Sequence, residues 1–461
     1  MDPISLSLIV LFIGSLLSFL VRRYSGLFST LTLLTSLIIL SINGMNFHQE
    51  YVLFKELDFS FGVFLDKLSF PLAFIVLLIS TLASYFSIDY MKGRKNVHLY
   101  FTCLLLFTAG MYGVLLSTNF IQFYIFWELM ILPAYFLIAY WGHRDASRVA
   151  LVFFIYMHIG GILILAGMLW LYSHTATFNI LHLIEKKHLL TLNSIKWLCL
   201  LFLVGFGIKM AIFPLHTWLP DAHSEAPAPI SAMLSGLMIG MGAYGIARIV
   251  LPLFGDFLLE YNSLLSTSSL LTMFYGAIMA LAQTDVKRLL AYSSISQMGY
   301  VFFGLFLPGL GYVGSVFQVI NHAIVKALLF FISGILIYVT GTRDMKELGG
   351  LLKDMPLTAC SCIIAALALS GIPFLNIFVS EWLIFQGGVM EGRIVSTGIA
   401  IALTFLTLAY SLWMVNKIFF GEKKNLRLKP LTLKFKVTIL LLTLMIVGIG
   451  VWPSIIVNIL T

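Results

Sequence analysis

Apolar residues form long runs along almost the whole chain, and polar residues collect in short segments between them. A run of about 20 apolar residues is long enough to cross a bilayer as an α-helix. The pattern therefore predicts an all-α, polytopic membrane protein with about fourteen transmembrane helices. These spans are expected at roughly 3–21, 27–43, 61–87, 98–116, 119–141, 149–172, 196–216, 229–252, 262–283, 289–308, 313–340, 357–388, 395–420 and 433–453.

Composition supports the membrane assignment and excludes a soluble fold. The 461 residues are 60% hydrophobic and 10% charged, and the mean hydropathy is +1.01. The longest polar interruptions, near 44–60 and 173–195, have the length of interhelical loops, so no aqueous domain is expected. The first apolar run lacks a basic flank and a cleavage site, and we therefore treat it as span 1 rather than as a signal peptide.

The basic residues predict how the chain is oriented. Nineteen of the 28 Lys and Arg residues fall in odd-numbered loops, whereas even-numbered loops hold only Lys55, Lys186, Lys187, Lys196 and Arg393. Positive charge concentrates on the cytoplasmic side of a membrane, so both termini are expected outside a cell (inner or plasma) membrane. The net charge of +8 follows from this bias and from contact with anionic lipid, and it does not indicate nucleic-acid binding.

A weaker regularity indicates two related halves. Spans 4–8 and spans 9–13 each contain a lysine-bearing helix and a proline-interrupted helix, with Pro214 in span 7 and Pro373 in span 12. Two units of five helices must insert in opposite orientations, which predicts an inverted repeat with discontinuous helices 7 and 12. The expected divisions are helices 1–3 at 1–97, the first repeat at 98–252, the second at 262–420, and a loop and helix 14 at 421–461.

Four ionisable residues lie deep inside apolar spans: Glu128, Lys209, Lys326 and Glu381. A charge in hydrocarbon costs several kcal/mol, roughly 3 on insertion scales, so such residues usually line an interior ion pathway. Burial of Glu128 disfavours its charged form and a nearby ammonium restores it, so a moving carboxylate would switch Lys209 between holding and releasing a proton. A structural ion pair that clamps helices is the alternative for Glu128.

Span 11 carries a second candidate cluster. His322 and Lys326 are four residues apart and therefore share one helix face, which favours a relay over an interior histidine that only packs. Glu381 ends the series in FVSEWLIF, where Pro373, Asn376 and Ser380 supply a helix break or polarity before it.

The segment HTWLPDAHSEAPAPISA follows span 7 and gathers four further polar groups: His216, Asp221, His223 and Glu225. We interpret it as a proton entry or gating loop. Metal ligation and helix capping remain alternatives, although Pro220 and Pro227 interrupt helical spacing between ligands. His158, between apolar residues and glycines, is expected to pack rather than transfer protons.

No cofactor is expected on this chain. It contains no nucleotide-binding glycine loop, nucleophile elbow, HExxH motif or haem-attachment Cys-x-x-Cys-His. Cys103, Cys199, Cys360 and Cys362 lie in apolar surroundings without metal-site spacing, and no chemistry is assigned to them.

Five segments together resemble one family: FWELMILPAYFLI, GFGIKMAIFPLHTWLPDAHSEAPAPISAMLSG, DVKRLLAYSSISQMGY, NHAIVKALLFFISG and GIPFLNIFVSEWLIF. They are similar to the antiporter-like, proton-translocating subunits of respiratory NADH:quinone oxidoreductase, of Mrp cation/proton antiporters, and of group 4 membrane-bound hydrogenases and formate hydrogenlyase. The resemblance implies fourteen helices, two inverted five-helix repeats and a midplane axis of charges. It further implies that Glu128 pairs with Lys209, Lys326 is the central lysine of the second half, and Glu381 is the terminal group.

The chain departs from that family pattern in three places. Many relatives carry a lysine or histidine midway through span 8, whereas this span offers Gly240 and Gly242 and no base before Arg248. Glu381 stands where some relatives carry lysine, in a context closer to the hydrogenase branch. The sequence also ends after span 14, without the lateral helix of the largest family member.

The leading hypothesis is a non-redox, proton- or cation-translocating subunit that works with other membrane subunits and a peripheral redox module. A component of a multisubunit secondary Na⁺/H⁺ antiporter is the alternative. A scaffold that has lost transport is a third possibility, which the glycine-rich span 8 keeps open.

Overall fold

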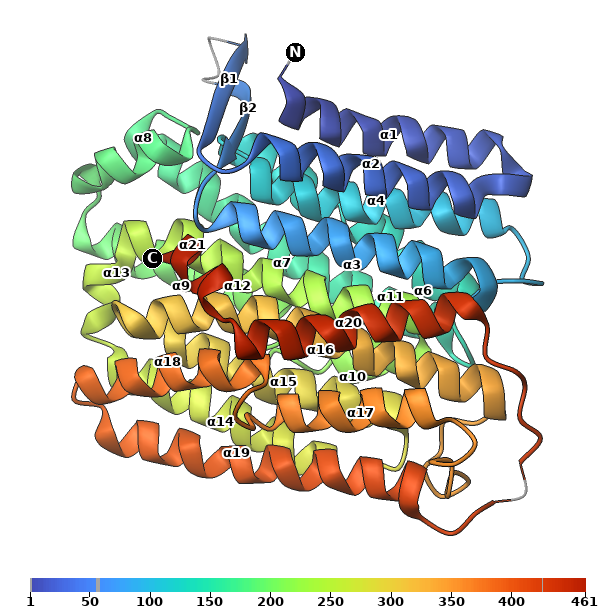
Figure 1. Cartoon of the computed structure of the whole chain (residues 1–461). Coiled ribbons are helices and arrows are strands. Elements are labelled where there is room, and N and C mark those ends of the chain that lie inside the picture. The colour runs from blue at the N-terminus through green and yellow to red at the C-terminus, as the bar shows by residue number, and fades with distance from the viewer. Residues whose placement is uncertain (1, 55–58, 425) are drawn as a thin grey trace. The chain divides into compact units, whose positions relative to one another are not determined.

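The computed structural model describes residues 2–54, 59–424 and 426–461, and it is built mainly of long α-helices with one two-stranded antiparallel hairpin (Figure 1). Lys55, one of the residues used above to predict orientation, lies outside the described residues. The α-helices are α1 (Pro3–Leu20), α2 (Ser25–Asn43), α3 (Ser69–Tyr90), α4 (Val97–Leu116), α5 (Phe120–Leu129), α6 (Ile131–Trp141), α7 (Ala146–Thr175), α8 (Ile180–Glu185), α9 (Leu192–Met210), α10 (Leu219–Glu225), α11 (Ala228–Met233), α12 (Ile239–Gly245), α13 (Leu251–Leu259), α14 (Asn262–Leu281), α15 (Val286–Leu305), α16 (Leu310–Thr340), α17 (Pro356–Leu369), α18 (Asn376–Met390), α19 (Ile394–Val415), α20 (Leu433–Val451) and α21 (Ser454–Leu460).

The remaining elements are short. They are the strands β1 (Phe47–Phe54) and β2 (Phe59–Leu65), the 3₁₀ turns η1 (Arg22–Tyr24) and η3 (Lys186–Leu189), and the π-helical segments η4 (Leu234–Met238), η5 (Ile246–Val250) and η6 (Asn416–Phe420). Two π-helical segments therefore fall within the eighth predicted span, on either side of Gly240 and Gly242.

The structure confirms the polytopic helical membrane fold. Among the described residues, twelve helices are long and apolar enough to cross a membrane. The other two predicted spans, 289–308 and 357–388, coincide with α15 and with the shorter pair α17 and α18. The count of fourteen transmembrane helices stays a prediction.

Span 3 was predicted to begin at residue 61, and this boundary is wrong. Residues 59–65 form β2, and α3 begins only at Ser69. The Asp66 carboxylate accepts hydrogen bonds from the backbone N–H groups of Leu68 (3.1 Å) and Ser69 (2.9 Å). Such a cap satisfies the free N–H groups of a first helical turn and fixes where the helix starts.

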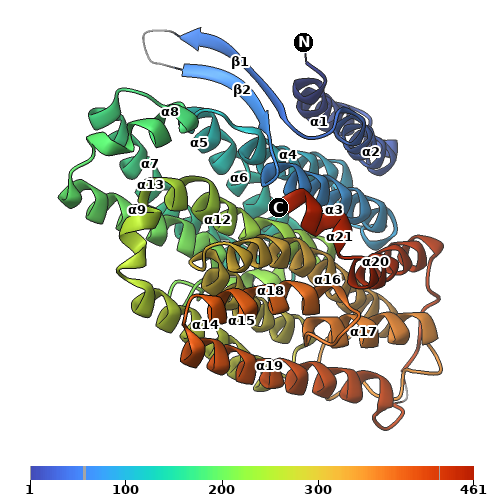
Figure 2. The same cartoon turned by 60° about the vertical axis from the view of Figure 1, so that its left-hand side comes forward.

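The chain forms two compact units, which are described separately. Unit 1 comprises Met1–Ser84, Gly93–Met210 and Leu237–Asn262, and unit 2 comprises Tyr85–Lys92, Ala211–Gly236 and Ser263–Thr461. In unit 1, α1, α2 and α4 lie side by side along their lengths (Figure 1). In unit 2, α16 packs against α15 and α18, and α19 lies beside α17 and α18 (Figure 2). The repeat boundaries predicted from the sequence stay a prediction.

The predicted discontinuities in spans 7 and 12 are present. The chain leaves helical geometry between α9 and α10, which includes Pro214, and again between α17 and α18, which includes Pro373. Each break contains a non-glycine residue in the left-handed backbone region, Ala211 (φ 60°) and Phe374 (φ 69°). Such conformations are uncommon outside glycine and persist only where the surrounding structure holds them.

A third break, in span 5, was not predicted from the sequence. α5 ends at Leu129, and α6 begins at Ile131. Pro133 explains the break, because it has no N–H to bond the Leu129 carbonyl one turn earlier, and its ring crowds that carbonyl. Glu128 is therefore the penultimate residue of a helix rather than the middle of a continuous one.

Candidate functional site

A first cluster of ionisable side chains lies in unit 1, where α5, α7 and α9 meet. Each of these helices contributes one such group: Glu128 from α5, His158 from α7 and Lys209 from α9. α7 packs against both α5 and α9. The three helices bring together residues that are up to 81 positions apart in the sequence.

Glu128 faces α7. Its Oε2 atom lies 3.4 Å from Nδ1 of His158, and the Tyr124 side chain, one turn earlier on α5, hydrogen-bonds the carboxylate. Oε1 occupies the space beside the α-carbon of Gly161, where a Cβ atom would overlap it. His158 and Gly161 are three residues apart and share one helix face, so this face of α7 forms the seat of the carboxylate.

Lys209 is buried in a different contact. Its side chain is 1% exposed, and Nζ lies 3.8 Å from the centroid of the Trp127 ring. Nζ has no hydrogen-bond acceptor among the described residues. An ammonium over an aromatic face gains electrostatic energy from the ring quadrupole, most strongly when it is desolvated.

Within the part of the chain that the structure describes, Glu128 and Lys209 form no ion pair within 4.0 Å. The two groups are nevertheless close enough for their charges to interact. The direct pairing that the family resemblance implies therefore stays a prediction. The expectation that His158 packs rather than transfers protons stays a prediction. Its ring stacks on Phe154, with centroids 4.1 Å apart, and its Nδ1 atom faces Glu128.

Span 8 has packing reasons for its glycines and for its arginine. A Cβ atom on Gly242 would lie 2.7 Å from the Phe206 carbonyl oxygen and 2.8 Å from the Met210 amide nitrogen, so the glycine lets α12 approach the backbone beside Lys209. Arg248 forms a bidentate pair with Asp66, at 2.8 and 2.6 Å. This pair ties η5 to the start of α3 and leaves Arg248 committed to a structural contact.

Asp66 shows the electrostatic effect of that pair. Burial acts to raise the pKa of its carboxyl, but the hydrogen bonds and charge of Arg248, together with the Ser69 contacts, hold the pKa below its ordinary value. The ionised form is therefore the stabilised one.

A second cluster lies in unit 2 around Lys326 on α16. Lys326 is fully buried, and its Nζ atom donates to the Leu290 carbonyl (3.1 Å) and to the Ser293 hydroxyl of α15. His322, one turn earlier, is 1% exposed, and its Nε2 atom has no hydrogen-bond partner among the described residues. His223 is close enough to interact electrostatically with both residues. The predicted shared face of His322 and Lys326 therefore points into the interior of unit 2.

A chain of buried amides and one hydroxyl links α15, α16 and α18. Gln318 donates to Gln297 (2.6 Å), Ser380 donates to Gln318 (2.5 Å), and Asn321 donates to Ser380 (3.0 Å). Asn376 donates in turn to Asn321 (3.1 Å). All five side chains have no exposed surface. The network extends from the helix of Lys326 to the helix of Glu381.

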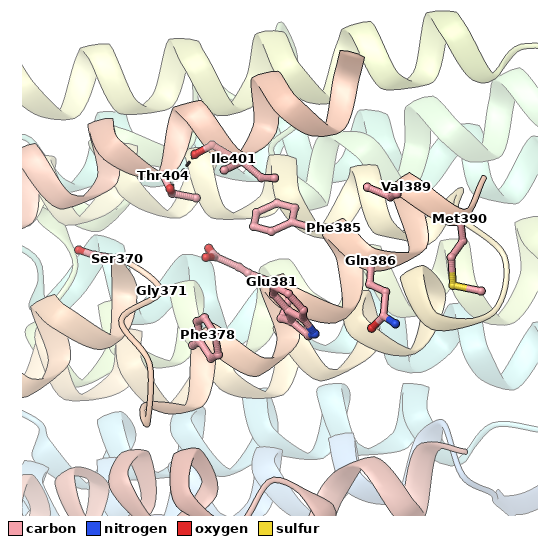
Figure 3. Close-up of a pocket in the computed structure, with 11 residues that line it drawn as sticks. Ser370, Gly371, Phe378, Glu381, Phe385, Gln386, Val389, Met390, Ile401 and Thr404 are labelled. Carbon is pink, nitrogen blue, oxygen red and sulfur yellow. Dashed lines mark hydrogen bonds between the residues drawn. The ribbon is translucent and has the colours of Figure 1, made fainter. Parts of the chain in front are cut away.

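Glu381 projects from α18 into a cavity of about 500 Å³. Figure 3 shows its carboxylate directed toward the end of the cavity lined by Ser370 and Thr404, while Gln386 and Met390 line the other end. Gln297 hydrogen-bonds the Glu381 side chain, and Oε2 fills the space beside Gly371, where a Cβ atom would overlap it. Glu381 thus has a neutral amide partner and room that a glycine provides.

The four polar residues after span 7 separate into two kinds. Asp221 pairs with Arg288 (2.7 Å), and Glu225 pairs with Arg343 (3.3 Å), so both carboxylates have basic partners. His216 packs on Phe213 and Tyr275, and His223 is fully buried against Phe330. Both ring nitrogens of His223 lack hydrogen-bond partners within the described ranges.

Pro220 does not interrupt this segment as expected. It lies in the first turn of α10, a position where the missing N–H of proline is tolerated. No group of three or more His, Cys, Asp or Glu side chains in the described part of the chain is arranged to hold a metal ion.

Sequence reasoning missed several residues of both clusters. Tyr124, Gly161, Ser293 and Gln297 are common residue types inside apolar helices, and each acquires its role only from a side chain on another helix. The spacing of Tyr124 and Glu128, one helical turn apart, was the only local signal available.

These observations define a class: a polytopic helical membrane protein with titratable groups held in its interior beside broken helices. The chain belongs to the family described as NADH:quinone oxidoreductase/Mrp antiporter, transmembrane, whose model matches residues 117–407. Residues 51–101 match a second model, described as NADH-ubiquinone oxidoreductase (complex I), chain 5 N-terminus.

Individual proteins are similar over most of the chain. NADH-quinone oxidoreductase subunit M of Rickettsia prowazekii is 32% identical over 445 residues, which cover 94% of this chain and 89% of the relative. A chain of respiratory complex I from Thermus thermophilus with bound NADH has the same fold, with a TM-score of 0.90 at 24% identity over 99% of this chain and 100% of that one. A chain of the membrane-bound sulfane sulfur reductase, an archaeal respiratory membrane complex, gives a TM-score of 0.90 at 25% identity and covers 100% of this chain and 77% of that one.

Proposed function

We propose that this chain is a proton- or cation-translocating, antiporter-like subunit of a membrane-bound respiratory complex. It carries no redox site of its own, and redox chemistry in partner subunits drives it. One observation carries the proposal: among the described residues, each unit holds a buried lysine that forms no ion pair with a carboxylate, Lys209 and Lys326. Each unit also holds a carboxylate seated against a glycine, Glu128 and Glu381. The families and relatives named above are consistent with this function.

In the first cluster, a shift of the Glu128 carboxylate would change the charge state of Lys209. A buried ammonium is stabilised by a nearby anion, and it loses that stabilisation when the anion moves away or becomes neutral. Trp127 holds the ammonium in place while the carboxylate moves, since the ring offers a contact that does not depend on Glu128.

In the second cluster, Lys326 would exchange protons with His322, and Glu381 would be the terminal group. Asn and Gln side chains do not readily pass on a net proton, so the amide network between α16 and α18 would orient Glu381 while water or the Ser380 hydroxyl carries the proton. His223, with both ring nitrogens free of partners in the described residues, would receive a proton from the loop side. Asp221 and Glu225, paired with Arg288 and Arg343, would form the gate of that entry.

Two matched backbone bridges support an internal repeat. Asn119 caps α5 and pairs with Asn179, which follows α7; Asp285 caps α15 and pairs with Asp344, which follows α16. The flanking bonds match as well, from Phe120 to Phe178 (2.8 Å) and from Val286 to Arg343 (3.0 Å). Gly161 follows Asn119, and Lys326 follows Asp285, at nearly the same distance along the chain. We propose that spans 4–8 and 9–13 are the two inverted units.

The membrane and the orientation also belong to this proposal. We place the chain in a cell (inner or plasma) membrane with both termini outside, because basic residues concentrate in the odd-numbered loops. Other membrane subunits would flank it, and a peripheral redox module would supply the energy.

The experiment uses the intact complex, purified with its native partner subunits and reconstituted in liposomes. Glu128→Ala, Lys209→Met and Lys326→Met should each abolish or strongly reduce redox-driven proton uptake. Lys196→Met is the matched control, since Lys196 is an exposed lysine on α9, the helix of Lys209. Pumping by the three variants at the wild-type rate would end the proposal.

The same preparation tests the alternatives. Sodium gradients that drive proton movement without any electron donor would favour a secondary Na⁺/H⁺ antiporter. A complex that retains redox activity but in which none of these substitutions affects transport would favour a scaffold.

A further inference from the structure

Like Tyr124, His158 is a titratable partner of Glu128 whose side chain reaches the surface of the chain. Its side chain is 40% exposed and that of Glu128 is 25% exposed, whereas Lys209 is buried. Among the described residues, the titratable groups that act on Glu128 are Tyr124 on its own helix, His158 on α7 and Lys209 on α9. The Glu128–His158 contact is therefore a point where the first cluster opens outward.

The contact is close, but it is not a fixed hydrogen-bonded clamp. The 3.4 Å between Nδ1 and Oε2 is slightly longer than an N–H···O hydrogen bond, and Nδ1 has no other partner in the described part of the chain. Stacking on Phe154 fixes the plane of the imidazole but leaves the orientation of Nδ1 toward the carboxylate unexplained.

The seat at Gly161 provides the second, independent observation. Without a side chain at position 161, the carboxylate can lie against α7, on the side of α5 that faces His158. Lys209 meanwhile rests on Trp127, and no carboxylate of the described residues forms an ion pair with it within 4.0 Å. The structure thus contains one resting place for the carboxylate at α7 and a separate resting place for the ammonium.

We propose that His158 is a proton-transfer residue that loads and unloads Glu128. In loading, the imidazolium gives its Nδ1 proton to Oε2: the N–H bond breaks, an O–H bond forms, and a cation and an anion become two neutral groups. Unloading is the reverse. The proposal rests on the proposed function, because a neutral Glu128 no longer stabilises the Lys209 ammonium, which then releases its proton onward.

The test combines transport with infrared spectroscopy on the intact complex. The C=O stretching band of the protonated Glu128 carboxyl is assigned as the band that Glu128→Gln removes. The band should appear and disappear during turnover of the wild-type complex, and it should do so more slowly in His158→Gln, which lacks the group that exchanges a proton with Glu128. Pumping by His158→Gln should fall roughly fivefold or more, the lower end of usual couplings between two sites, with an altered pH profile.

Two further variants keep the test decisive. His174→Gln makes the same change near the end of α7, away from Glu128, and should leave both the band and the pumping rate unchanged. His158→Leu serves as a second variant if His158→Gln assembles poorly, and it should slow the change of the band in the same way.

The proposal and the proposed function fail in different ways. If Glu128→Gln abolishes pumping while His158→Gln matches wild type in the rate of the band change and in the pH profile of pumping, His158 has no part in proton transfer and the proposed function stands. If Glu128→Gln itself pumps at the wild-type rate, the proposed function is wrong.

Discussion

A methyl group added at Gly161 tests the seat of the Glu128 carboxylate directly. In Gly161→Ala the new Cβ atom would overlap Oε1, so the carboxylate must retreat from α7 by about 1 Å to restore a normal C···O contact of roughly 3.3 Å. The obstructing atom is the far end of a flexible side chain, and alanine is favoured over glycine in a helix by about 1 kcal/mol, so the fold should not lose stability.

Transport should respond far more than stability does. A displacement of about 1 Å in a group that exchanges protons can slow a reaction by up to about a hundredfold, so we expect pumping to fall by roughly ten- to a hundredfold. The measurement is proton uptake per electron transferred by the reconstituted complex, with redox activity recorded in parallel. This ratio separates a loss of coupling from a loss of assembly.

Two companion variants sharpen the result. Gly167→Ala adds the same methyl on the same helix, where it meets the Phe202 ring at 2.9 Å instead of the carboxylate, and it should pump normally. Glu128→Asp in the Gly161→Ala background shortens the acid by one methylene and should recover part of the activity as a non-additive pair. If Gly161→Ala pumps like wild type and Gly167→Ala, the position of the carboxylate against α7 is irrelevant to transport.

Three further predictions concern other contacts. Ser293→Ala removes a hydrogen-bond acceptor of Lys326, worth about 1 kcal/mol, and should slow pumping roughly fivefold. The control, Ser333→Ala on α16, should not slow pumping. Equal rates in the two variants would contradict a role for the Ser293 contact. Asp66→Asn should destabilise the complex by about 1–3 kcal/mol in thermal unfolding at neutral pH. Because the pKa of Asp66 is lowered in the folded protein, its contribution to stability is complete above the unfolded pKa of about 3.9 and is lost as pH falls below that value. The stabilities of wild type and variant should therefore converge in acid. A difference that stays constant with pH would refute the stabilising role of ionised Asp66. Gly242→Ala drives a methyl into backbone atoms of Phe206 and Met210 and should destabilise by about 1–3 kcal/mol, whereas Gly448→Ala, which meets nothing within 4 Å, should be neutral.

Much of the fold follows from local pattern. The apolar runs located nearly all the helices, because a bilayer-spanning helix must be both long and apolar. Pro214 and Pro373 marked the breaks in spans 7 and 12, since proline removes a helical hydrogen bond wherever it occurs. The strand at 59–65 was mistaken for the start of span 3 because a short apolar run fits a strand as well as a helix.

The candidate site was predicted only in part. Glu128, Lys209, Lys326 and Glu381 stand out because charge is rare inside such spans. The helix break at Met130 was not predicted, although Pro133 is present in the sequence, because the surrounding residues are uniformly apolar and resemble a continuous span. The partners Tyr124, His158 and Gln297 gave no comparable signal, because polar or small residues in a helix acquire meaning only from the helix opposite.

The sequence by itself determined that the chain lies in a membrane, that it is helical, and which charged residues are buried. Hydropathy and charge are properties of each residue in its own segment, so these features can be predicted locally. Only the tertiary structure decided which groups meet: Glu128 with His158, Lys209 with Trp127, and Lys326 with Ser293. These contacts depend on how separate helices rotate and approach one another. That geometry is set by side-chain packing and by glycines such as Gly161 and Gly242, which let neighbouring helices approach. It depends on pairs of helices, so the sequence of a single span does not predict it.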